Sequence, residues 1–139
     1  MNRMELRQLA EDRLNDAALL LAGQRWSAAY YLSGYAVECG LKACILAYVE
    51  KSGAIFEDKK FGEKCWTHNL TVLRELADLD NVFDRTILGD PQLLSNWNTA
   101  EDWEETTRYQ QKSQSEAEKL YEAIADAKSG VLTWIRMHW

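Results

Sequence analysis

Hydrophobic positions crowd into one segment of the chain. Residues 26–49 contain only two charged side chains, Glu38 and Lys42, and every other position there is apolar, small or hydroxyl-bearing. A helix that is apolar on all sides must be surrounded by protein or by lipid. The pattern therefore predicts a central helix that begins at residue 25 or 26 and continues to about residue 51.

The predicted central helix has two apolar faces. One is formed by Tyr30, Gly34, Val37, Leu41, Ile45 and Tyr48, and the other by Ala28, Leu32, Tyr35, Cys39, Ala43 and Leu46. Two apolar faces need two packing partners, and one short bundle rarely supplies both. We expect one face in the core of the monomer and part of the other in a twofold homodimer.

A membrane location for this segment is disfavoured by its charges. A helix of this length, roughly 36 Å, is long enough to span a bilayer. Glu38 and Lys42 would then lie near the membrane midplane, where each costs about 2.5–3.5 kcal/mol. Residues 1–13 are too rich in charge for a signal peptide. We expect a buried helix in a cytoplasmic protein that has no membrane partner.

Helical periodicity continues on both sides of the central segment. A first helix is expected over residues 4–22, with the apolar stripe Leu6, Ala10, Leu14, Ala17 and Leu21, and Gly23 is its natural stop. Gly53 ends the central helix, and residues 52–66 are expected to form a loop. Thr67 is the expected N-cap of a third helix, which ends near residues 78–81 and turns Leu70, Leu73 and Leu76 inward.

The C-terminal half predicts two more helices. Asp90 followed by Pro91 indicates a short helix over residues 91–97, and residues 98–113 are expected to be a loop with short helical turns. Ser113 and Glu116 form a capping box that opens a final helix. Its stripe is Ala117, Leu120, Tyr121, Ile124, Ala127, Val131 and Trp134. The prediction is an all-α, up-and-down four-helix bundle with an additional short helix, in a single domain of residues 1–139.

Composition narrows the class of protein. The net charge of −6 disfavours strong nonspecific binding of nucleic acid, although a local basic pocket stays open. Three cysteines, two of them in the central helix, fit reduced thiols rather than disulfides. Cys65 and His68 have the spacing of metal ligands, but zinc needs four ligands and the chain shows no second pair. We expect no metal and no cofactor.

Four short sequences follow one another in a recognisable order. They are YAVE at residues 35–38, LKA at 41–43, HNL at 68–70 and RY at 108–109. In this order and spacing the chain, from about residue 16 to residue 135, resembles the HEPN domain family, the nucleotide-binding domains of higher eukaryotes and prokaryotes. The resemblance implies a helical bundle that is usually dimeric.

The resemblance also carries expectations about function. Many HEPN domains stand beside a small nucleotidyltransferase in prokaryotic toxin–antitoxin or defence modules, some bind nucleotides, and others are RNases. This chain would then be a binding or regulatory component with a nucleotidyltransferase-type partner. Two alternatives stay open: a divergent, metal-independent RNase of the HEPN class, and a purely structural dimeric scaffold.

RNase members of the family carry an Arg, four to six residues, and then a His. Residues 61–63, which precede His68 at that distance, are Phe, Gly and Glu, and residues 131–133, which precede His138, are Val, Leu and Thr. The motif is absent, so we assign no catalytic residue. A divergent RNase would need His68 and Arg108 to lie close together and open to a cleft.

The candidate ligand-binding residues are Glu38, Lys42, His68, Arg108 and Tyr109. In the simpler interpretation, Glu38 and Lys42 are an i,i+4 pair that fixes helix register, and His68 hydrogen-bonds Glu38. In the functional interpretation, Lys42 and Arg108 bind the phosphates of a nucleotide or RNA, while Tyr109 or Trp103 stacks on a base. His68 would then be an acid–base group.

Six tryptophans are many for this length. We expect Trp26, Trp66, Trp97 and Trp134 in the core, and Trp103 and Trp139 at the surface, where aromatic side chains mark partner contacts. The acidic residues Glu101, Asp102, Glu104 and Glu105 are interpreted as a solvated loop, or as a surface for a basic partner protein.

Overall fold

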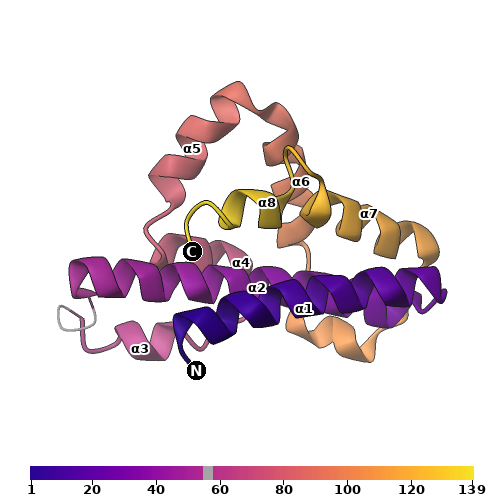
Figure 1. Ribbon diagram of the computed structural model, residues 1–139, viewed down its shortest axis with the longest axis horizontal. Helices are drawn as coiled ribbons and strands as arrows, with labels where there is room; N and C mark the ends of the chain where they lie inside the picture. Colours follow the sequence, from indigo (N-terminus) through magenta and orange to yellow (C-terminus); the bar gives the residue numbers. More distant parts are fainter. Residues whose placement is uncertain (55–57) are drawn as a thin grey trace.

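The computed structural model describes residues 1–54 and 58–139, which contain helices and no strand, so the predicted all-α class is confirmed for these ranges. The elements are α1 (Arg3–Ala22), α2 (Trp26–Ser52), α3 (Phe61–Lys64), α4 (Leu70–Leu76), α5 (Asp80–Gly89), α6 (Pro91–Glu101), the 3₁₀ helix η2 (Glu105–Tyr109), α7 (Gln114–Ala125) and α8 (Val131–Ile135). Helix α2 runs along the length of the molecule beside α1, and α5 lies at the top of the view, apart from them (Figure 1).

Helix α1 lies along α2 as a long hairpin (Figure 1). It begins at a capping box, in which Asn2 and Glu5 bond each other's backbone N–H groups at 2.8 Å. It ends at Gly23, as predicted. Its buried residues are Leu6, Ala10, Leu14 and Ala17, which are four of the five positions of the predicted stripe. The periodicity of the sequence therefore identified the face of α1 that packs on α2.

Helix α2 is the core of the molecule, in contact with α1, α4, η2, α7 and α8. Five residues of its first predicted face are buried: Tyr30, Gly34, Val37, Leu41 and Ile45. The second face is more open, because Ala28 is exposed and Leu32, Tyr35 and Leu46 are only half-buried. By length and hydropathy α2 could cross a membrane, and 61% of the 18-residue window that meets these criteria is buried inside the described structure.

The region after α2 differs from the prediction in two ways. The expected loop at 52–66 contains the short helix α3, and its residues 55–57 lie outside the described residues. The third helix starts later than expected, because Asn69 rather than Thr67 is the N-cap and accepts a hydrogen bond from the N–H of Val72 at 3.1 Å. Thr67 instead accepts the N–H of Asn69 at 3.2 Å. His68 therefore lies in the turn before α4, not in its first turn.

Helix α5 was not predicted. Of its ten residues Phe83 is buried, so the segment shows no apolar stripe of the kind that indicates a helix. It is held by Arg74 of α4, whose Nε donates to Asp80 Oδ1 at 2.8 Å. The guanidinium carbon of Arg74 lies 4.1 Å from the ring centre of Phe83 and 4.5 Å from that of Trp97. These cation–π contacts attach α5 to α4 and α6. The next helix, α6, starts at the predicted Pro91 and continues beyond residue 97 to residue 101.

The predicted final helix is two helices, α7 and α8. Ser113 caps α7 as expected, accepting the N–H of Glu116 at 3.1 Å. The chain leaves the helix at Asp126, whose carboxylate accepts the N–H of Ser129 at 2.7 Å. A Cβ at Gly130 would overlap the backbone of Asp126, so only glycine allows this tight turn. The periodicity continued through the turn because α8 also packs on α2.

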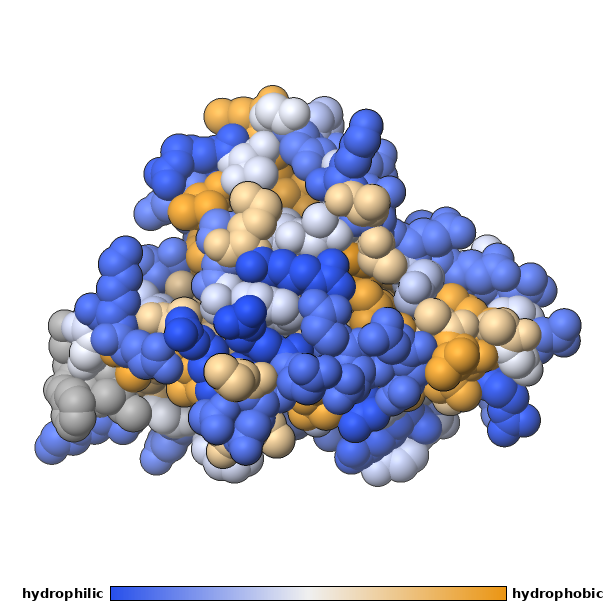
Figure 2. Space-filling model, in the orientation of Figure 1, coloured by the Kyte–Doolittle hydropathy of each residue, from blue (hydrophilic) through white to orange (hydrophobic). Residues whose placement is uncertain are grey.

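Two tryptophans exchange their expected places. Trp103 is only 2% exposed, and its ring lies against Gly34 of α2, where no side chain intervenes. Trp66 is 81% exposed. On the face drawn in Figure 2, most of the surface is hydrophilic and hydrophobic side chains form separate patches.

Gly34→Ala is expected to lower the free energy of unfolding by about 2–3 kcal/mol, because the new methyl group would overlap the buried ring of Trp103. Urea denaturation measures the change. Gly62→Ala is the matched control: a Cβ there meets open space, so its effect should stay within about 0.5 kcal/mol. Equal effects of the two substitutions would contradict the close packing of Trp103 on α2.

Candidate functional site

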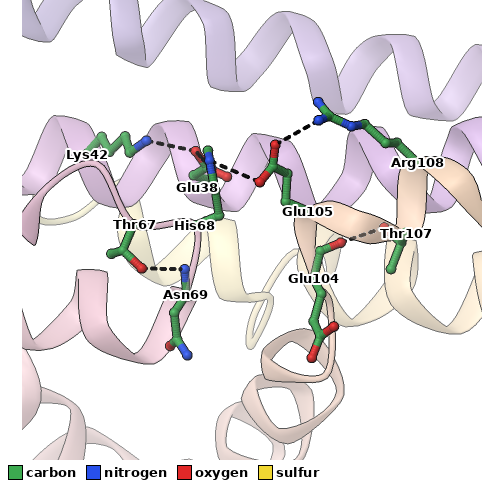
Figure 3. A network of polar contacts seen from close by, with 9 residues as sticks. All are labelled: Glu38, Lys42, Thr67, His68, Asn69, Glu104, Glu105, Thr107 and Arg108. Carbon is green, nitrogen blue, oxygen red and sulfur yellow. Dashed lines mark hydrogen bonds and ion pairs between the residues drawn. The ribbon is translucent and has the colours of Figure 1, made fainter.

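The candidate residues come from three segments that meet beside the middle of α2. Glu38 and Lys42 belong to α2, His68 to the turn before α4, and Arg108 and Tyr109 to η2. Figure 3 shows the polar contacts that join four of them. The structure therefore brings together residues that lie up to 70 positions apart in the sequence, 38 to 108.

Glu38 is the centre of this network and is only 2% exposed. Its Oε1 accepts from Lys42 Nζ at 2.8 Å and lies 2.9 Å from His68 Nδ1 (Figure 3). The expected Glu38–His68 contact is thus present. Oε2 is buried and has no hydrogen-bond partner in the described parts of the chain. A buried carboxylate is costly unless it is compensated, and here Lys42 and His68 supply that compensation on one side only.

His68 extends the network to η2 through a residue that sequence reasoning did not select. Its Nε2 lies 3.1 Å from Oε2 of Glu105, and Oε1 of Glu105 lies 3.2 Å from Nη2 of Arg108. His68 and Arg108 are each a little under half exposed, so this end of the network faces solvent. One carboxylate, that of Glu105, therefore holds the histidine and the arginine together.

The sequence places Glu105 in an acidic stretch that is interpreted as a solvated loop or as a surface for a basic partner protein. The one sequence signal for a contact of Glu105 is its spacing of three residues from Arg108. Residues three apart are neighbours on a helical turn, and residues 105–109 form such a turn. Thr107 helps to shape the turn, since its hydroxyl donates to the carbonyl of Glu104 at 2.7 Å (Figure 3). The contact with His68 joins segments 37 residues apart, 68 to 105, which no local pattern predicts.

Glu38 and Lys42 also contribute to the wall of an apolar groove of about 530 Å³ between α1, α2 and α3. Most of its lining is hydrophobic, including Leu6, Leu9, Tyr35, Leu46, Val49, Phe61 and Trp66. Two cysteines line it as well. Burial raises the pKa of the Cys39 thiol to about 11 and also raises the pKa of Cys65, so both are protonated thiols at neutral pH. Neither is poised as a thiolate nucleophile.

Arg108 and Tyr109 line a different pocket, of about 630 Å³, beside the turn that joins α1 to α2. Lys42 and His68 do not belong to its lining. The five candidate residues are therefore divided: Arg108 belongs to both the network and the pocket, while Tyr109 faces the pocket and is 78% exposed. Trp103, the other expected stacking residue, is buried and cannot stack on a ligand.

Comparisons of the chain with protein-family models, with curated proteins and with solved structures found no match. The HEPN resemblance is therefore a hypothesis from the four sequence motifs, which none of these comparisons supports.

Glu38→Gln is expected to lower the free energy of unfolding by about 1.5–3 kcal/mol, because a neutral amide cannot compensate the Lys42 ammonium that donates to Oε1. The control is Glu50→Gln on the same helix. Glu50 forms an exposed pair with Arg3 at 3.5 Å, and its loss should cost less than about 1 kcal/mol. Chemical denaturation compares the two variants, and a smaller effect at position 38 would show that the network does not stabilise the fold.

Proposed function

We propose that this chain is a HEPN-like binding module, a regulatory component of a prokaryotic toxin–antitoxin or defence system whose partner is a nucleotidyltransferase-type protein. The motifs that carry the resemblance supply α2, the turn before α4 and η2. Their polar residues Glu38, His68 and Arg108 meet in one network, which is the arrangement expected if the motifs have a common role.

The observation that favours binding over catalysis is the state of His68. Both ring nitrogens lie within about hydrogen-bond distance of carboxylates, Nδ1 with Glu38 at 2.9 Å and Nε2 with Glu105 at 3.1 Å. A general base needs a free nitrogen that can reach the proton it removes. In this arrangement His68 joins α2 to η2, and Arg108 is paired with Glu105. The geometry supports a fixed connection rather than a reaction centre.

A divergent HEPN-class RNase is the second candidate, because one observation favours it. His68 and Arg108 contact the two oxygens of the same carboxylate, and both are partly exposed. Displacement of Glu105 would place an imidazole and a guanidinium side by side, as acid–base catalysis of phosphodiester cleavage requires. No metal ion enters this mechanism.

Homodimerisation belongs to the same proposal and is supported by the second face of α2. Leu46 and Tyr35 of that face are half-buried and line the apolar groove. A second copy of the chain would cover this groove through a twofold interface. A dimer without any partner or ligand would be the purely structural scaffold, the third alternative, and only binding measurements separate it from the regulatory module.

The purified protein is expected to leave RNA intact and to form a stable complex with a co-expressed minimal nucleotidyltransferase in size-exclusion chromatography. Labelled single-stranded RNA is incubated with wild type and with His68→Ala. Cleavage by wild type that falls by about 10²–10⁴-fold in His68→Ala would establish the RNase and overturn the binding proposal. If the protein neither forms the complex nor cleaves RNA, the purely structural dimeric scaffold is the alternative that remains.

Leu46→Glu is expected to convert a dimer into a monomer, because it places a charge in the apolar groove. Sedimentation equilibrium should give twice the chain mass for wild type and the single mass for the variant. Leu88→Glu is the control, since Leu88 is 86% exposed on α5 and lies outside the groove. A monomeric wild type would refute the dimer, and dissociation by both variants would place the interface elsewhere.

A further inference from the structure

The apolar groove between α1, α2 and α3 has a single charged spot in its wall. Its volume of about 530 Å³ lies within the range of small-molecule sites, roughly 300–1,000 Å³. Among the described residues, Glu38 and Lys42 are the only charged side chains in its lining, and most of the others are hydrophobic. A concave apolar surface with a few polar groups in one place is the usual form of a site for a small organic molecule.

The carboxylate of Glu38 has one oxygen in use and one to spare. Oε1 contacts both Lys42 Nζ and His68 Nδ1, whereas Oε2 is buried and has no hydrogen-bond partner in the described parts of the chain. An ionised carboxylate can only accept hydrogen bonds, and a buried acceptor without a donor is rare in proteins. Glu38 lines the groove although it is almost fully buried, so its carboxylate belongs to the floor of the groove. A donor on a bound molecule would satisfy Oε2.

Lys42 supplies the opposite capacity beside this oxygen. Its ammonium carries three N–H donors, and in the described structure one hydrogen bond is formed, to Oε1 of Glu38 at 2.8 Å. The side chain is partly exposed and lines the same groove. Residues four apart lie on one face of a helix, so the spare donors of Lys42 and the spare acceptor of Glu38 are neighbours. The charged spot therefore matches a group that both donates and accepts.

The other titratable side chains of this lining are neutral. Burial raises the pKa of Tyr35 to about 12 and that of Cys39 to about 11, and it also raises the pKa of Cys65. The charges of Glu38 and Lys42 offset each other. An ammonium group on a ligand would meet Lys42, and a carboxylate would meet Glu38. Either ion would also lose its hydration in an apolar groove, so the arrangement favours a neutral ligand.

We propose that the groove binds a neutral, mainly apolar molecule that carries a hydroxyl group. The hydroxyl donates to Glu38 Oε2 and accepts from Lys42 Nζ. The apolar part of the ligand lies against the aliphatic side chains of α1 and α2, which are Leu6, Leu9, Leu46 and Val49. No phosphate or base takes part, and the site does not depend on the HEPN resemblance.

One consequence of this site rests on the proposed function. The proposed homodimer covers the same groove, so the ligand and a second copy of the chain would exclude each other. If wild type is a dimer, a saturating ligand should shift its sedimentation equilibrium toward the single chain mass. The two proposals fail separately: a monomer that binds the ligand refutes only the dimer, and a dimer that ignores excess ligand refutes only the ligand site.

A fluorescence titration with 1-octanol and its isomer 1-methoxyheptane tests the site. Trp66 lines the groove and is exposed, so a bound apolar chain should shift its emission to shorter wavelength. Trp66→Phe should remove that shift. The ether has the same atoms as the alcohol but no hydrogen to donate, so 1-octanol is expected to bind about tenfold or more tightly. Protein is kept dilute and ligand in large excess, so that a second copy competes least.

Variants and charged analogues locate the contact. Octylamine and octanoate should both bind more weakly than 1-octanol. Glu38→Gln places an amide N–H where Oε2 accepts, so the preference for the alcohol over the ether should be lost, and thermal melting checks that this variant is folded. Leu46→Glu should weaken binding about tenfold or more, and Leu88→Glu, outside the groove, should not change it.

Four results would overturn the proposal. They are no emission shift up to the solubility limit of 1-octanol, equal affinity for the alcohol and the ether, tighter binding of either ion, and an alcohol preference that survives in Glu38→Gln. A shift that persists in Trp66→Phe would place the ligand beside another tryptophan and would overturn it as well.

Discussion

The burial of α2 is the constraint on which the rest of the structure depends. A helix that is apolar on every side must be covered on every side. Among the described residues, α1 covers α2 along its length and α4, η2, α7 and α8 cover parts of its other faces, while Ala28 is exposed and Leu32, Tyr35 and Leu46 are half-buried. Glu38 is the single acidic residue of the apolar segment 26–49 and is almost fully buried. Lys42 and His68 compensate the Glu38 carboxylate, and the contact with His68 holds the turn before α4 against α2. His68 also contacts Glu105, so the same turn is joined to η2.

Local patterns predicted the elements whose signals are local. The stripe of α1, the end of α2 at Gly53, the proline start of α6 and the Ser113 cap all follow from residues within a few positions of one another. The division of the final helix was missed because both halves turn apolar residues to the same core, so the stripe continues across the break. Helix α5 was missed because its main attachment, Arg74 between two aromatic rings, involves two other helices.

The candidate site was predicted only in part, because a sequence pattern reveals contacts within one helix but not contacts between distant segments. Glu38 and Lys42 are one helical turn apart, so their pairing could be inferred from the sequence. The role of Glu105 depends on its contact with His68, which belongs to a distant segment of the chain. The exchange of Trp66 and Trp103 shows this most clearly: an aromatic residue in an acidic run is buried because Gly34, 69 positions earlier, leaves room for its ring. The signal that the sequence offered for this contact is Gly34 itself, a glycine inside an otherwise apolar helix.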